Sequence, residues 1–310
     1  MINNDFNSLY ELFSAFHDEQ SCIEHLESLR WDGVVISPFD STSKVYKCKD
    51  NRYRCKNTGK YFNVKTNTLF DNTKISLRKW FAAIWLVTSH KKGISSHQLS
   101  RDIDVTQKTA WFMLHRIRKA FGMNNDISDN GQLDGTVEVD ETFIGGKNKN
   151  RHKEKKVQAC QGRSFKDKVP VFGMAQRCGK VIAKVVQDTK SHTLFGIISK
   201  FVKPGSRLYT DEWNYSNEAD VCYEHRNVNH GIGFYGNGDL TTNHIEGFWG
   251  LVKRSIMGIY YHWSKKHMQR YVDECVFRYN TRQYEDCTRF NFLLQTSERR
   301  LTYKQLLYGE

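Results

Sequence analysis

The sequence has only 3 prolines and no long apolar run, and its 8 cysteines show no close paired spacing. Scarce proline excludes a proline-rich linker, so domain boundaries have to come from changes in residue pattern. The longest apolar run, Trp80–Val87, is far shorter than the roughly 20 residues of a membrane helix. Dispersed cysteines are typical of reduced thiols in the cytosol. Together with the lack of a visible signal peptide, these absences predict a cytoplasmic protein without a membrane partner.

Positive charge is abundant. Lys and Arg number 47 against 34 Asp and Glu, and the formal net charge of +13 is scattered along the chain. A basic globular protein of this kind is attracted to polyanions such as DNA or RNA. A basic protein with no role on nucleic acid stays possible on charge alone. The 310 residues can form one catalytic domain and one or two small modules.

Changes in hydrophobic period divide the chain into five parts. Helical spacing comes first, followed by short alternating strands, then three helices, and then an α/β pattern. A polar linker rich in Asp, Asn and Gly, 124–135, precedes the α/β part. The predicted parts are an N-terminal helical segment (1–32), a small β module (33–72), a helical domain (73–123), an α/β catalytic domain (136–286) and a C-terminal tail (287–310).

The helical domain ends in a helix, a tight turn and a basic second helix. Ser95 or Ser96 can cap the first helix, Asp104–Val105 form the turn, and Thr106 can cap the second. This is the helix-turn-helix pattern, whose second helix can enter a major groove. The apolar stripe of that helix is Ala110, Leu114, Ile117 and Phe121, and the candidate DNA contacts are Lys108 and Arg116. An ordinary helical hairpin is the alternative.

The α/β part alternates strands with helices. Strands are expected near 137–144, 169–177, 180–187, 207–211 and 221–229, and helices near 191–202, 243–259 and 264–284. The segment Gly146–Lys168 is a basic loop that could follow a phosphate backbone, with Lys147 as its candidate contact. A solvated hairpin fits the same pattern equally well.

Three acidic residues lie in three separate settings within this part. Asp140 is in the first strand, in VEVDETFIGG, and Asp211 ends a neighbouring strand, in LYTDEWN. Glu246 lies near the start of an amphipathic helix, in TTNHIEGFWGLVKR. Phosphodiester cleavage needs an activated nucleophile and charge neutralisation, which two Mg²⁺ ions roughly 3.5–4 Å apart supply. Mg²⁺ prefers oxygen ligands, so these three carboxylates predict a two-metal site for Mg²⁺ or Mn²⁺.

The role of Glu246 has a competing explanation. Asn243 followed three residues later by Glu246 is a capping-box pattern, in which the glutamate only satisfies the start of the helix. The helix favours a functional role, because Ile245, Trp249, Val252 and Ile256 bury one side and leave Glu246, Gly250 and Lys253 together on another. Lys253 and Arg254 are therefore candidate DNA contacts. On the first strand, Glu138, Asp140 and Thr142 share a face opposite Val137 and Val139.

Four sequence blocks, together with a fifth segment after them, resemble the ISXO-type insertion-sequence transposases, which are bacterial DDE enzymes related to Merlin elements. The blocks occur in the family's order and are RKWFAAIWLVTSHKKGISSHQLSRDIDVTQKTAWFMLHRIRKAFG, VEVDETFIGG, LYTDEW and TNHIEGFWGLVKR, followed by YVDECVFRYNTR. The resemblance implies a ribonuclease-H-like domain with Asp140, Asp211 and Glu246 as the metal-binding triad. It also implies cleavage at element ends and attack of the freed 3′-hydroxyl on target DNA. Asn243 and His230 match positions near such an active site, although a core or turn role for His230 is open.

The sequence departs from the family in the small β module. Family members commonly carry a zinc ribbon there, C-P-x-C followed by C-x-x-C. In this chain Ser37 and Asp40 stand at the first pair, and Cys55 and Thr58 at the second. A structural zinc needs four soft or borderline ligands, so we predict no zinc. The strands are expected to persist as a metal-free module held by Tyr46, Tyr53, Tyr61 and Phe62.

Three functions remain in competition. The first is an active transposase that acts on double-stranded DNA as a homodimer or larger assembly, associated with the nucleoid. The second is a domesticated or regulatory helix-turn-helix protein that binds DNA without cleaving it. The third is a related ribonuclease-H-fold nuclease of repair or of RNA hybrids. The acidic triad favours an enzyme over a pure binder, because uncompensated carboxylates repel phosphate.

Overall fold

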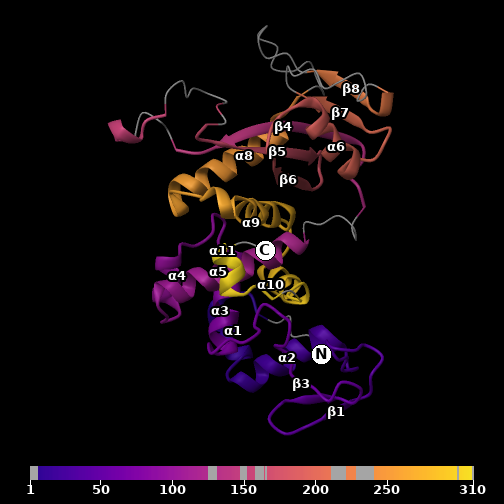
Figure 1. The fold of residues 1–310 in the computed structure, drawn as a ribbon, viewed down its shortest axis with the longest axis vertical. Coiled ribbons are helices and arrows are strands. Elements are labelled where there is room, and N and C mark those ends of the chain that lie inside the picture. The colour runs from indigo at the N-terminus through magenta and orange to yellow at the C-terminus, as the bar shows by residue number, and fades with distance from the viewer. Residues whose placement is uncertain are drawn as a thin grey trace. The chain divides into compact units, whose positions relative to one another are not determined.

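The computed structural model describes residues 6–124, 131–146, 152–157, 164, 166–210, 221–227, 241–298 and 300–308. The chain folds into two compact units (Figure 1). Unit 1 contains Met1–Asn124 together with Gln283–Glu310, and unit 2 contains Asn125–Arg282. In the described part of the chain, no helix combines the length and the hydropathy required to cross a membrane.

Unit 1 is mainly helical, and short polar residues begin its helices. Ser76 and Ser95 each accept a hydrogen bond from the third amide of the helix that follows. Leu77, Trp80, Phe81, Ile84 and Val87, the residues predicted to form one apolar face, are all buried. The helices are α1 (Leu9–Ala15), α2 (Glu19–Trp31), α3 (Leu77–Ser89), α4 (Ser96–Asp102), α5 (Gln107–Asn124), α10 (Asp286–Gln295) and α11 (Tyr303–Tyr308).

The C-terminal residues belong to the core of unit 1, so the predicted separate tail at 287–310 is wrong. Helix α10 packs against α2 and α3. Its Phe290 is fully buried, with ring centroids 5.2 Å from Phe81 and 5.4 Å from Phe6. Edge-to-face contacts of this kind stabilise an aromatic core beyond the burial of area alone. The N-terminal helices therefore need the far end of the chain to complete their core.

A small antiparallel sheet in unit 1 contains β1 (Val45–Lys47), β2 (Tyr53–Cys55) and β3 (Tyr61–Phe62), in that order. Tyr53, Cys55 and Phe62 are buried, and Tyr53 and Phe62 stack at 5.7 Å. Tyr46 and Tyr61 instead face solvent, with 43% and 57% of their surfaces exposed. The prediction that all four aromatic residues hold the module is therefore wrong for Tyr46 and Tyr61, because side chains alternate along a strand.

Helices α4 and α5 are joined by a tight turn, as the sequence pattern predicts. Asp104 adopts a left-handed backbone with φ of 50°, and the Thr106 hydroxyl accepts the amide of Thr109 at 3.2 Å. The predicted apolar stripe of α5, at Ala110, Leu114, Ile117 and Phe121, is buried. A cap, a left-handed turn residue and an apolar stripe together explain this helical pair.

Unit 2 is built on a mixed five-stranded sheet, which confirms the predicted α/β class. The strand order is β6-β5-β4-β7-β8, with β4, β5 and β6 antiparallel and β4, β7 and β8 parallel. The strands are β4 (Thr136–Ile144), β5 (Val169–Gln176), β6 (Val181–Val185), β7 (Arg207–Thr210) and β8 (Glu224–Asn227). They match the five strands expected from alternation.

Helices cover both faces of this sheet (Figure 1). On one face Val137 and Val139 pack with Leu194 and Ile198 of α6 (Ser191–Phe201). On the other face Val171 and Ala183 pack with α8 (Asn243–Ser255) and α9 (Met268–Asn280). Single-turn segments complete the described elements of unit 2 at η3 (Lys153–Lys155), η5 (Ile256–Tyr260) and η6 (Lys265–His267).

Candidate active site

Strand β4 directs its even-numbered side chains toward α8. Val137 and Val139 pack in the cluster of α6, whereas Ile144 packs in the cluster of α8. Because side chains alternate along a strand, Glu138, Asp140 and Thr142 share the side of Ile144. Glu138 and Asp140 therefore share one face, as predicted from alternation, and the structure adds that α8 covers this face.

Asp140 is half-buried in the middle of this face. Its Cα pairs with Gly173 on β5, and its Oδ1 accepts the amide of Glu141 at 2.8 Å. On the other side of β4, Thr210 at the end of β7 pairs with Val139. Asp211 is the next residue in the chain after Thr210 and lies outside the described residues.

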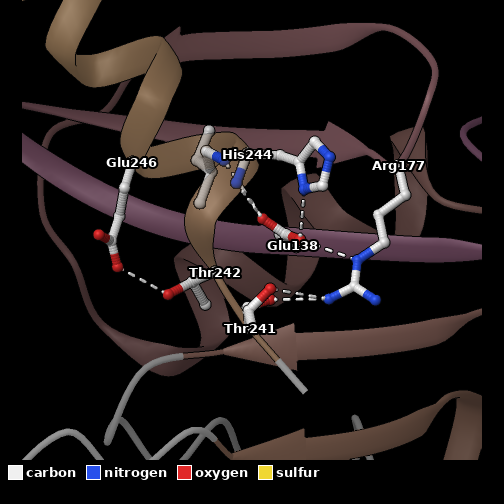
Figure 2. A network of polar contacts seen from close by, with 7 residues as sticks. Glu138, Arg177, Thr241, Thr242, His244 and Glu246 are labelled. Carbon is white, nitrogen blue, oxygen red and sulfur yellow. Dashed lines mark hydrogen bonds and ion pairs between the residues drawn. The ribbon is translucent and has the colours of Figure 1, made fainter. Parts of the chain in front are cut away.

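Glu138 is fully buried and is the centre of a polar network, which Figure 2 shows. The Nε of Arg177 donates to its Oε1 at 2.9 Å. The backbone amides of His244 and Ile245 donate to its Oε2 at 2.8 Å and 3.3 Å, and the His244 Nδ1 lies 3.0 Å from Oε1. A buried carboxylate therefore has four polar partners, one from the turn after β5 and three from the start of α8.

This network joins the first turn of α8 to the middle of the sheet. The first amides of a helix have no partner within the helix, and the helix dipole favours negative charge there. The carboxylate of Glu138 on β4, 106 positions earlier in the chain than His244, accepts from these amides and supplies the negative charge. Arg177 strengthens the junction, because it also donates to the carbonyl and the hydroxyl of Thr241 at 3.1 Å and 3.2 Å.

The capping-box explanation of Glu246 is wrong. Asn243 is the first residue of α8 itself, and the next two amides, of His244 and Ile245, donate to Glu138 instead. The exposed carboxylate of Glu246 accepts a hydrogen bond from the Thr242 hydroxyl at 2.8 Å (Figure 2). Glu246 is thereby oriented at the start of the helix while its side chain stays accessible.

Close packing also determines the position of α8. A Cβ at Gly173 would lie 2.5 Å from the Trp249 ring and 2.8 Å from the end of Ile245. Any larger residue would push the helix away from β5. Since Gly173 pairs with Asp140, this contact helps to place the helix that carries Glu246 beside the strand that carries Asp140.

The outer side of α8 is polar and basic. Ile245, Trp249 and Val252 are buried, whereas Glu246, Lys253 and Arg254 are exposed. Asn243 is exposed at the first position of the helix. Lys147 and His230, two other predicted site residues, lie outside the described residues.

Arg116 of α5 is not available to DNA, which corrects its assignment as a contact. Its guanidinium is buried and donates to the carbonyls of Leu301 and Leu69 at 3.0 Å and 2.8 Å. Burial lowers the pKa of Arg116 to about 10, although Asp71 favours the charged form. Lys108, the other predicted contact of this helix, is exposed beside the ring of Tyr303.

Carboxylate oxygens in this arrangement suit a hard divalent cation. Asp140 and Glu246 come from a strand and a helix that pack together, and Glu246 is exposed. Among the residues that the structure describes, no group of three or more His, Cys, Asp or Glu lies close enough to form a metal site. The third predicted ligand, Asp211, is outside that set, so the metal site itself stays a prediction.

The donors in the small β module do not fit zinc. Burial raises the pKa of Cys55, but hydrogen bonds with the hydroxyls of Ser37, Ser43 and Thr58 outweigh burial and lower it to about 6. One thiol surrounded by hydroxyl groups is not a tetrahedral zinc ligand set. The expected lack of zinc stays a prediction, to be tested by metal analysis of the purified protein.

Sequence reasoning missed the residues that position the candidate site. Glu138 was placed on the correct face but given no role, and Arg177, His244 and Gly173 were not singled out. One signal was present, because an acidic residue between two valines of a buried strand requires a strong partner. The residues next to Glu138 in the sequence do not indicate which residue that partner is.

The protein thus has a mainly helical unit and an α/β unit in which an amphipathic helix with exposed basic residues packs on the central strand of a mixed sheet. Residues 132–280 match the family described as the ISXO2-like transposase domain. The chain is 36% identical over 105 residues to an uncharacterised transposase-like protein of Haemophilus influenzae, covering 33% of this chain and 81% of that protein. The chain belongs to the insertion-sequence transposases.

A second relative extends the similarity along the chain. An uncharacterised protein in the transposable element ISH50 of Halobacterium salinarum is 28% identical over 256 residues, which is 77% of this chain and 84% of that protein. Two solved structures are more distant. The Mos1 strand transfer complex has a TM-score of 0.30 at 11% identity, covering 70% of this chain and 75% of that one. A pre-cleavage Mos1 transpososome has a TM-score of 0.30 at 10% identity, covering 94% and 97%.

Proposed function

We propose that this transposase is a DDE enzyme with a ribonuclease-H-like unit 2, which cleaves the ends of an insertion sequence and joins their 3′-hydroxyls to target DNA. One observation carries the proposal. Glu138 joins α8 to β4, so that a half-buried aspartate and an exposed glutamate occupy neighbouring elements on one face of the sheet. Membership in the transposase family supports the same conclusion.

Asp140, Asp211 and Glu246 are the proposed ligands of two Mg²⁺ or Mn²⁺ ions. Such ions, when bound, activate the attacking oxygen and neutralise charge on the leaving oxygen. The protein's own contribution is orientation, through the Thr242 hydroxyl on Glu246 and the Glu138 network at the start of α8. Asn243 and His230 are proposed as supporting residues near the active site.

Exposed basic residues are the proposed DNA contacts. Lys253 and Arg254 follow Glu246 along α8, and Lys253 lies roughly 10 Å further along the helix at 1.5 Å per residue. A phosphate backbone that meets these residues would pass over the candidate carboxylates. We also propose that α4 and α5 act as a helix-turn-helix with Lys108 as a contact, and that Lys147 binds the backbone.

Replacing Asp140 tests the enzymatic proposal. Asp140→Asn keeps the size of the side chain but removes its charge, so cleavage of element-end DNA with Mg²⁺ should fall by about 100- to 1000-fold or more. Binding of the same DNA, measured by fluorescence anisotropy, should change little. Asp134→Asn is the matched control, because Asp134 is an exposed acid of unit 2 that pairs with Lys203. Full cleavage by Asp140→Asn would refute the proposal.

A strand-transfer assay separates transposition from simple nuclease activity. Pre-cleaved ends with free 3′-hydroxyls should become joined to a plasmid target in the presence of Mg²⁺. Because transposition requires two ends in one complex, we propose a homodimer or larger assembly, to be measured by light scattering with end DNA bound. Cleavage without joining would favour a repair-type nuclease instead.

A further inference from the structure

The outer face of the small sheet in unit 1 carries a row of three side chains. Tyr46 on β1 and Tyr61 on β3 both pair with Arg54 on β2, one on each side. All three point away from the buried side that contains Tyr53, Cys55 and Phe62. Two tyrosine rings therefore face solvent on adjacent strands, with an exposed arginine between them.

This row lies in a strongly basic segment of the chain. From residue 44 to residue 60 the only acidic residue is Asp50, whereas every lysine and arginine in this range is exposed. Two cations lie against the rings, with Lys44 Nζ 5.6 Å from the centre of Tyr46 and Arg54 Cζ 5.8 Å from the centre of Tyr61. Alternation places Lys44, Arg52 and Lys56 on the side of the row, whereas Lys47 pairs with Tyr53 on the other side and Lys60 lies over the ring of Phe39.

The chemistry of this surface selects its ligand. An apolar protein partner would gain little from such an excess of cations, whereas a polyanion gains from each of them. Aromatic rings on a flat sheet offer stacking surfaces to bases, and bases inside a duplex are already stacked. Neighbouring strands lie about 4.8 Å apart, so Tyr46 and Tyr61 are about 10 Å apart, a distance that one strand of nucleic acid can bridge.

We propose that the face of Tyr46, Arg54 and Tyr61 binds single-stranded DNA, with bases stacked on the two tyrosines and phosphates paired with Arg54 and the neighbouring lysines. This site belongs to unit 1, whereas the candidate carboxylates belong to unit 2, and binding at it needs no metal. The choice of DNA rather than RNA rests on the proposed function. Binding itself is independent of cleavage.

The test uses the full chain in EDTA and a fluorescent 12-nucleotide thymidine strand. Replacing both tyrosines, Tyr46→Ala with Tyr61→Ala, should weaken binding by about 5-fold or more, because each stacking contact is lost. Replacing both with Phe keeps the rings and should restore binding. Tyr10→Ala is the matched control, since Tyr10 is 82% exposed on α1.

A second measurement locates the contact within a chain that has other basic surfaces. Irradiation of a strand containing 5-iodouracil, followed by mass spectrometry, should place the crosslink on Tyr46 or Tyr61. A duplex of the same length should bind the double alanine variant and the parent protein equally. An abasic strand should bind both proteins equally as well.

Three outcomes would overturn the inference. The first is a set of crosslinks confined to other segments, and the second is unchanged strand affinity in the double alanine variant. The third is an equal loss of affinity for duplex and for single strand in that variant, which would indicate a general basic surface. Tighter binding of a uridine strand than of the thymidine strand would assign the face to RNA and overturn the choice of DNA. Strand binding is measured in EDTA and end cleavage is measured with Mg²⁺, so a failure of strand binding leaves the cleavage proposal untouched.

Discussion

In unit 1 the basic helix α5 has Arg116 buried against backbone carbonyls, whereas in unit 2 the basic helix α8 exposes Lys253 and Arg254 to solvent. Both helices present the same pattern in the sequence, an apolar stripe with basic residues beside it. The difference lies in their neighbours. Segments around Leu69 and Leu301 cover α5 on the side of Arg116, while Lys253 and Arg254 on the outer side of α8 are exposed.

Each unit also contains a buried charge that joins distant segments. Arg116 connects α5 to residues 69 and 301, and Glu138 connects β4 to Arg177 and to the start of α8. A buried charge is tolerated only when its hydrogen bonds are complete. The comparison therefore assigns structural roles to these two residues and leaves binding roles to exposed charges.

The largest effect is expected at Glu138. Glu138→Ala leaves Arg177 and two helix amides without their acceptor, so the free energy of unfolding of unit 2 should fall by about 3–5 kcal/mol. Urea denaturation measures the loss, and hydrogen exchange should locate it at the start of α8. Glu224→Ala is the control, because its partners Arg207 and Arg226 are exposed. Equal losses in the two variants would contradict a special role for burial.

A smaller effect is expected at Arg116. Arg116→Met fills a similar space but leaves two buried carbonyls without a donor, which should lower the stability of unit 1 by about 2–4 kcal/mol. The salt dependence of DNA affinity should not change. Lys108→Met should leave the stability of unit 1 unchanged. It should reduce the slope of log DNA affinity against log salt concentration by about 1. If Arg116→Met altered DNA affinity without altering stability, the assignment of a structural role would be wrong.

Glycine substitutions test the packing of α8. Gly173→Ala places a methyl group against Trp249 and should destabilise unit 2 by about 1–3 kcal/mol. Gly247→Ala on α8 meets no atom within 4 Å and should stabilise the helix by about 0.5–1 kcal/mol. Thermal unfolding gives both values. A loss of cleavage in Gly247→Ala despite its higher stability would indicate that DNA approaches this position closely.

The smallest effect is expected at Lys253. Removing one phosphate contact with Lys253→Ala should lower the salt slope of DNA binding by about 1 and leave stability unchanged. Anisotropy titrations at several salt concentrations measure the slope. Lys200→Ala on α6, an exposed lysine that packs near Phe201, is the control. An equal decrease in both variants would remove the distinction between the two helices.

Periodicity predicted most of the elements but not their partners. The strands at 137–144 and 169–177 and the helix at 191–202 were predicted within one residue of β4, β5 and α6. Hydrophobic alternation is a local property, so a short window is sufficient to read it. Helix α10 was misassigned as part of a tail because its buried face packs on residues far away in the sequence, such as Phe6 and Phe81.

For the candidate site, alternation placed Glu138 and Asp140 on one face, and helical spacing placed Glu246 with Lys253. Neither pattern could show that Glu138 is buried beneath the start of α8 or that Arg116 is enclosed. A charged side chain on an amphipathic helix looks the same in sequence whether water or a backbone carbonyl satisfies it. Its surroundings depend on segments far away in the chain.

The sequence alone determined the elements of this protein, its family and the faces on which its acidic residues lie, because backbone periodicity and motif order are local. Tertiary structure decided which charges are buried and which are available for binding. That choice depends on which distant segments cover each helix, and the free energy of a charged group depends on whether those segments complete its hydrogen bonds.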